Sequence, residues 1–168
     1  MNEYLSVSAR YNRGANRKLV AALATMASTD PAAFDQDRGS YYKSLHGLFN
    51  HVVGGEIYLL KLIAKTLPDH HALAFPELAV PMAPGVPAFP DFPEAAKALE
   101  ALDTAYIALA TESDEVLATM IAVHDATRRL GDLLVSAMAH AAHHRGQVSQ
   151  VLDELKIDND FYAAMREI

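Results

Sequence analysis

The placement of proline is the strongest constraint on how this 168-residue chain folds. All eight prolines lie between Pro31 and Pro93, and six of them fall between Pro68 and Pro90. Because proline interrupts helices, the segment 68–92 is predicted to be a long connection, either a crossover or a functional flap. Apolar residues recurring every three or four positions predict helices on both sides of it, at about 2–27, 40–66, 93–113 and 129–155.

These elements predict an all-α fold, a four-helix bundle with a long crossover loop, in a single domain spanning 1–168. Asp91 is predicted to be the N-cap of the third helix, with Pro93 in its first turn. A polar connector over 114–128, with room for a short helical turn, leads to the fourth helix. A last short helix is expected to start at Asp158, and no segment shows sustained strand alternation.

Composition narrows the class of protein. The formal net charge is −7, and no basic stripe is present, which disfavours nucleic acid as a partner. No apolar run approaches the roughly 20 residues of a membrane span, and the N-terminus does not resemble a signal peptide, so the expected location is cytoplasmic and away from membranes. The chain has no cysteine, which excludes disulfides, zinc–thiolate sites and a cysteine nucleophile.

The segment from His140 to Gln147 carries the clearest chemical signal. His144 falls on the apolar seam of its predicted helix, and His140 lies one turn earlier on the same face, so both imidazoles can share one ion. His143 falls on the flank and is predicted to support the site or line its rim. The alternative is that these are core histidines whose nitrogens are satisfied by hydrogen bonds, but two neutral imidazoles in an apolar seam need polar partners.

A third metal ligand is expected from the helix predicted at 40–66. His46 and His51 lie about 140° apart on its helical wheel, so they cannot both face one point. His51 has Gly47 one turn before it and Gly54 and Gly55 one turn after it, and these glycines suggest that room is needed beside its side chain. We therefore expect His51, His140 and His144 to bind one divalent metal with one or more positions left open, and His46 to be structural or exposed.

Three segments together form a recognisable pattern: Tyr11-Asn-Arg-Gly-Ala-Asn16, Ser44-Leu-His-Gly-Leu-Phe-Asn-His51 and His140-Ala-Ala-His-His-Arg-Gly-Gln147. In this order and at these separations they resemble the DinB family over about residues 4–155. The resemblance implies a DinB-like bundle in which the same three histidines hold zinc, nickel or a similar ion, and in which homodimers are common. It also implies a small-molecule substrate and a low-molecular-weight thiol as co-substrate, because the relatives include bacillithiol and mycothiol transferases and a thiol-dependent isomerase.

The chain departs from the family pattern near the first histidine. Glu56 and Tyr58 stand where relatives often have Asp and Trp, and Gly14 replaces a usual Trp, so pocket shape cannot be carried over. Glu56 is expected to be a buried partner for an arginine or histidine, with a general base as the alternative. Arg145 is a further candidate to support the site.

Other residues have simpler expected roles. Asn12 and Asn16 share one helix face and are expected to tie helices together. Tyr4 and Tyr11 are expected to lie in the core. His70 and His71 are expected to be exposed to solvent.

Two functions compete at this point. The first is a metal-dependent enzyme, an S-transferase or a related catalyst that acts on a small electrophile with an external thiol. The second is a non-catalytic module that binds a metal or small ligand in a stress response. An exchangeable position on the metal favours the enzyme, whereas a fourth protein ligand that closes the site favours the module.

Overall fold

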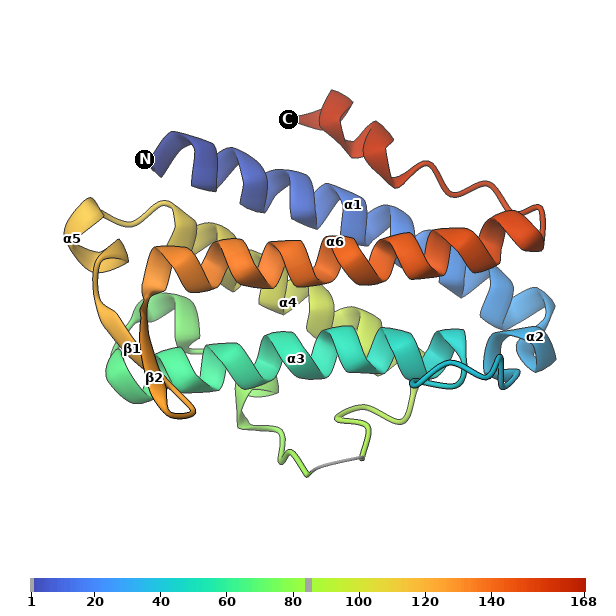
Figure 1. Ribbon diagram of the computed structural model, residues 1–168, viewed down its shortest axis with the longest axis horizontal. Helices are drawn as coiled ribbons and strands as arrows, with labels where there is room; N and C mark the ends of the chain where they lie inside the picture. The colour runs from blue at the N-terminus through green and yellow to red at the C-terminus, as the bar shows by residue number, and fades with distance from the viewer. Residues whose placement is uncertain (1, 84–85) are drawn as a thin grey trace.

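The computed structural model describes residues 2–83 and 86–168, and in this part of the chain four long helices form the core (Figure 1). They are α1 (Asn2–Thr29), α3 (Leu45–Thr66), α4 (Phe92–Ala110) and α6 (Leu130–Glu154). Helix α1 packs against α4 and α6, and α3 packs against the same two helices. The all-α class is therefore confirmed, and α3 and α6, which carry the predicted metal ligands, are direct neighbours.

Polar caps set where two of these helices begin. Asp91 accepts a hydrogen bond from the backbone N–H of Glu94 at the start of α4, as predicted. Ser44 accepts one from Gly47, so α3 begins at Leu45 and not near residue 40 as the apolar pattern suggested. Residues 39–44 form a turn instead, with left-handed backbone at Gly39 (φ 71°) and Lys43 (φ 65°).

A long crossover joins α3 to α4, as the prolines predicted, although residues 84 and 85 of this segment lie outside the described ones. The described part contains two short 3₁₀ helices, η1 (His71–Leu73) and η2 (Pro76–Ala79). Figure 1 shows that the crossover returns the chain along α3, so that α3 and α4 run in the same direction. The Nζ atom of Lys61 on α3 donates to the carbonyl oxygen of Val80, which fastens the crossover to that helix.

The connector after α4 differs from the expectation of a purely helical or irregular segment. It contains the predicted helical turn, α5 (Asp114–Leu117), and then a β-hairpin of β1 (Met120–Val123) and β2 (Ala126–Arg129), paired antiparallel. Each strand has only four residues, and of their side chains only Ile121 is buried. Strands this short cannot show a sustained alternation, which is why the sequence pattern missed the hairpin.

The C-terminal segment of the chain packs on α1. A short helix, α2 (Pro31–Asp35), follows α1, and the final 3₁₀ helix, η3 (Phe161–Glu167), packs against α1. A Cβ on Gly14 would lie 3.1 Å from the Cβ of Ala164, so this glycine allows the C-terminal segment to approach α1 closely.

The prediction that Tyr4 lies in the core is wrong, since its side chain is 83% exposed. No helix among the described residues is long and apolar enough to cross a membrane.

Candidate metal centre

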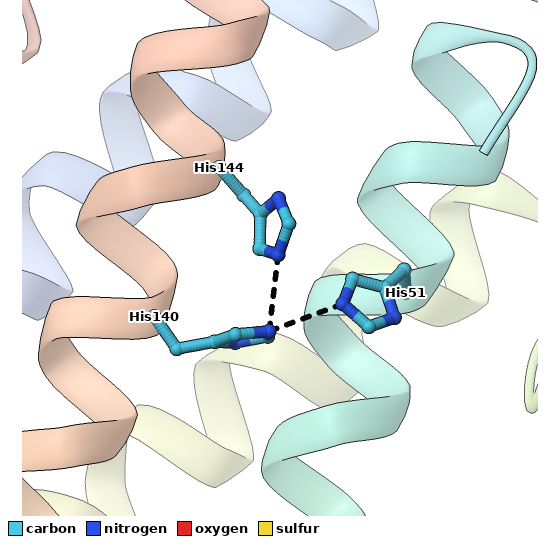
Figure 2. Close-up of side chains that lie close together, drawn as sticks. All are labelled: His51, His140 and His144. Atoms are coloured by element: carbon cyan, nitrogen blue, oxygen red, sulfur yellow. Dashed lines mark hydrogen bonds between the residues drawn. The ribbon is translucent and has the colours of Figure 1, made fainter. Parts of the chain in front are cut away.

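Three histidine side chains from two helices converge on one point (Figure 2). His51 comes from α3, and His140 and His144 come from successive turns of α6. The Nε2 atom of His140 lies 3.0 Å from Nε2 of His51 and 3.0 Å from Nε2 of His144. The structure thus brings together the three residues that the sequence selected.

The close approach of α3 and α6 depends on a glycine. A Cβ on Gly55 would lie only 3.2 Å from Cε1 of His140, so a larger residue would push against the imidazole ring. At Gly54 the nearest atom to an added Cβ is Cε of Met82, at an ordinary 3.7 Å. The room that the sequence predicted beside His51 is therefore used by the ring of His140, and Gly55 is the residue that provides it.

The three rings are neutral at physiological pH. Burial, together with the neighbouring His144 and His140, lowers the pKa of His51 to about 4. The pKa values of His140 and His144 are also lowered, again mainly by burial. Neutral imidazoles are the form in which histidine binds metals.

Gln147 fixes the tautomer of His144. The Nδ1 atom of His144 lies 2.7 Å from Oε1 of Gln147. A carboxamide oxygen can only accept, so Nδ1 carries the proton and donates it, and the lone pair of Nε2 points toward the other two histidines. The sequence contained Gln147 in its last motif, but gave it no role.

Tyr42 is the second residue of the site that sequence reasoning missed. Its hydroxyl lies 2.9 Å from Nε2 of His51, and its ring stacks on that imidazole at 3.9 Å between centroids. It also meets the ring of His144 edge-on. Burial, and then the neighbouring Tyr41, raises the pKa of Tyr42, which keeps its hydroxyl protonated.

The other candidates lie around this cluster. His143 is exposed, and its ring centroid lies 4.9 Å from that of His144, which fits the predicted place on the rim. Arg145 points the other way, toward α1, and is only 5% exposed. Its Nη1 donates to Oδ1 of Asn12 at 2.8 Å and to Oδ1 of Asn16 at 2.5 Å.

These contacts belong to a buried polar network that joins α6, α1 and α4. The amides of Asn12 and Asn16 donate in turn to Oδ1 of Asp103, at 3.2 and 2.9 Å. Burial raises the pKa of Asp103 to about 7, against the opposing effect of the hydrogen bond from Asn16. The two asparagines therefore tie helices together through their side chains, as expected.

Glu56 lies at the edge of the same network. It is 2% exposed, and its Oε2 atom has no hydrogen-bond partner within the described part of the chain. Burial raises its pKa well above the ordinary value, Asp103 raises it further, and the charge of Arg145 opposes both. Glu56 is thus a buried acid. Its charged form is stabilised by the positive charge of Arg145 and destabilised by the negative charge of Asp103.

A surface hollow on α6 is separate from the three histidines. It measures about 480 Å³ and lies between α1, α6 and the C-terminal segment, with Tyr11, Arg145, Ser149 and Tyr162 in its lining. None of the three histidines lines it. The histidine cluster and this hollow are therefore two separate sites on the molecule.

A second group of possible ligands, His70, His71 and Glu112, joins the crossover to the end of α4. His70 is not solvated as predicted, because its Nδ1 accepts from the backbone N–H of Ala72 and its Nε2 lies 3.1 Å from Oε1 of Glu112. With Nδ1 accepting, Nε2 carries the proton and donates it to the carboxylate. This contact fastens the crossover, and it leaves His70 without a free lone pair for a metal.

The histidine cluster, in contrast, fits a divalent ion. Two imidazoles bound to one tetrahedral zinc at about 2.0–2.1 Å have their nitrogens about 3.3 Å apart, close to the 3.0 Å separations of this cluster. Each ring is neutral, and His144 has its lone pair oriented by Gln147. The donor set is one that zinc, nickel and copper all accept.

Comparison with known proteins identifies one family. The sequence model described as the DinB family matches residues 1–155. No curated protein and no solved structure matches the chain. The matched region includes all three histidines and the buried network, and it ends before the C-terminal segment that packs on α1.

Proposed function

The chain belongs to the DinB family, and on that premise we propose that it binds one divalent metal ion through His51, His140 and His144. The ion serves catalysis on a small molecule. The observation that carries the proposal is the convergence of three neutral imidazoles from α3 and α6, each with one ring nitrogen within 4.8 Å of those of the other two. Zinc and nickel are the ions we propose, because both are divalent and imidazole suits both.

Three protein ligands favour an enzyme over a structural site. Structural zinc sites are usually closed by four protein ligands, whereas catalytic sites keep a position for water or substrate. His51 and His140 are only partly buried, which leaves the cluster reachable from solvent. A divalent ion held here would supply Lewis acidity, which favours the deprotonated form of a thiol or water.

The absence of cysteine shapes the reaction that we propose. A thiol-dependent reaction needs its sulfur from outside the chain, in line with a low-molecular-weight thiol as co-substrate. In such an S-transfer the thiol sulfur forms a bond to an electrophilic carbon. The leaving group departs with its electron pair, and the thiol proton passes to solvent.

One observation favours the second candidate, a non-catalytic metal- or ligand-binding module. The Tyr42 hydroxyl, 2.9 Å from Nε2 of His51, is a fourth protein group at the cluster. If its oxygen closed the coordination sphere, little room for a substrate would remain. The role of Tyr42 therefore separates the two candidates.

The first experiment is elemental analysis of the untagged protein purified without chelators. We expect about one divalent metal per chain in the wild type and none in the His140→Ala/His144→Ala double variant. The exposed His143→Ala variant is the matched control and should retain the metal. A metal-free wild type, even after reconstitution, would reject the proposal.

Catalysis is tested next with the metal-loaded protein and a panel of thiols and electrophiles. Acceleration of thiol transfer that is lost in the double variant would support the enzyme. No acceleration across the panel would favour the non-catalytic module. The homodimer and the cytoplasmic location stay family-level and composition-level predictions, which light scattering and cell fractionation would test.

A further inference from the structure

Tyr42 occupies a position at the histidine cluster that packing alone does not explain. Its ring covers one face of His51, yet its hydroxyl is directed at Nε2, the nitrogen that faces the other two histidines. The oxygen is 2.9 Å from that nitrogen, and His140 Nε2 is 3.0 Å from the same nitrogen. The distance from the Tyr42 hydroxyl to His51 Nε2 is thus about equal to the distance between the Nε2 atoms of two candidate metal ligands, His51 and His140.

The local backbone is built to hold Tyr42 there. Its carbonyl oxygen accepts from the N–H of Ser44 at 2.8 Å, in a tight turn that requires left-handed backbone at Lys43. A Cβ on Gly47 would lie 2.2 Å from this carbonyl oxygen, so only glycine lets the turn fold against the first turn of α3. Ser44 then caps the helix through the N–H of Gly47 at 3.0 Å. Ser44 and Gly47 therefore hold the backbone of Tyr42 against the first turn of α3, the helix that carries His51.

The metal and the hydroxyl compete for one lone pair. Without an ion, the Tyr42 hydroxyl lies at hydrogen-bond distance from Nε2 of His51, and its O–H can donate there when Nε2 carries no proton. An ion bound to Nε2 uses that lone pair, and the phenol must turn its proton elsewhere. A phenol O–H is a hydrogen-bond donor, and its strongest bonds are to charged acceptors, so its natural partner is a negatively charged group beside His51.

We propose that Tyr42 donates this hydrogen bond to a small anion, such as a thiolate, that takes the open position on the metal. This inference rests on the proposed function and deepens it. Tyr42 is then a residue that positions the anionic co-substrate, and it does not close the site as a fourth ligand. The two phenol rings, Tyr41 and Tyr42, are neighbours in sequence, but Tyr41 is 91% exposed and provides a control.

The test uses cobalt(II)-loaded protein, because the visible spectrum of cobalt reports coordination without any activity assay. Azide and 2-mercaptoethanol are titrated into the wild type, Tyr42→Phe and Tyr41→Phe. We expect Tyr42→Phe to bind cobalt within about twofold of the wild type but to bind both anions about tenfold more weakly, the size expected for one hydrogen bond to a charged group. Tyr41→Phe should match the wild type in both measurements.

Each other outcome has a distinct meaning. A loss of cobalt affinity of a hundredfold or more in Tyr42→Phe would make Tyr42 a closing ligand and overturn the inference. Unchanged anion affinity in Tyr42→Phe would also overturn the inference, and the Tyr42 ring would then serve only to pack against His51. A wild type that binds no cobalt would overturn the proposed function together with this inference, so the two failures are distinguishable. Phenylalanine keeps the ring stacked on His51, and thermal unfolding of the metal-free variants checks that the fold is retained.

Discussion

A Cβ on Gly55 would lie 3.2 Å from Cε1 of His140, so the glycine of one helix sets the position of a candidate ligand on the other. The neighbouring Gly54 meets only the end of a flexible methionine. The two adjacent glycines therefore make a matched pair for experiment.

The first prediction concerns this pair. Gly55→Ala should displace the His140 ring and weaken metal binding about tenfold, whereas Gly54→Ala should leave it unchanged. Both substitutions favour the helix by up to about 1 kcal/mol, so a loss of metal affinity would not come from helix propensity. Isothermal titration of the metal-free proteins with zinc measures both effects, and equal affinities in the two variants would contradict the prediction.

The second prediction concerns the tautomer of His144. Gln147→Ala removes the acceptor 2.7 Å from Nδ1 and should lower metal affinity by about 10- to 100-fold, the usual effect of losing a partner behind a metal-binding histidine. Gln150→Ala, at an exposed position on the same helix, is the control. Competition with a chelating dye gives the affinities. If both variants bind equally well, Gln147 does not orient the ring.

The third prediction concerns the turn that carries Tyr42. Gly47→Ala places a Cβ 2.2 Å from the carbonyl oxygen of Tyr42, a contact that the backbone must relieve. We expect a loss of about 1–3 kcal/mol in the free energy of unfolding, as for other overpacked sites. Urea denaturation measures it. A stable variant with normal anion binding would show that the turn is not needed to place Tyr42.

The fourth prediction concerns pH. The pKa of Asp103 is raised from 3.8 to about 7, chiefly by burial, so between these values the folded chain holds a proton that the unfolded chain releases. Stability from this group is full below pH 4 and is lost as the pH rises toward 7. Asp103→Asn should remove this dependence, so the wild type should lose stability relative to the variant between pH 5 and 7.5.

Urea denaturation of the metal-free proteins at both pH values tests this difference. The exposed Asp132→Asn variant serves as the control, because it should follow the wild type. Parallel stability profiles for Asp103→Asn and the wild type would show that the Asp103 carboxyl stays ionised in the folded protein. The buried Arg145 and its two asparagine partners would then be the groups that stabilise the negative charge of the Asp103 carboxylate.

The sequence predicted the parts of this molecule that repeat regularly. Helical periodicity and proline placement gave the long helices and the crossover, and the seam of α6 placed His140 and His144 on one face. Periodicity also indicates which face of a helix is apolar, but it does not show how much of the helix length is covered by neighbouring elements. For this reason Tyr4, on the predicted stripe, lies exposed at the start of α1.

The residues that the sequence did not reveal depend on irregular backbone. Tyr42 reaches His51 only through the turn at Lys43, whose positive φ has no sequence signature in a lysine. Gln147 acts on a ring nitrogen, and that role follows from an atomic distance and not from a pattern. The hairpin after α5 has too few buried residues to stand out from a polar connector.

The separation of the ligands along the chain has a consequence for folding. His51 and His140 are 89 residues apart, and the crossover, α4 and the hairpin all lie between them. An ion shared by these two side chains would act as a reversible cross-link that closes a long loop, which the unfolded chain could form only at a large entropic cost. Metal binding would then be coupled to folding, and the melting temperature would rise with the concentration of free ion.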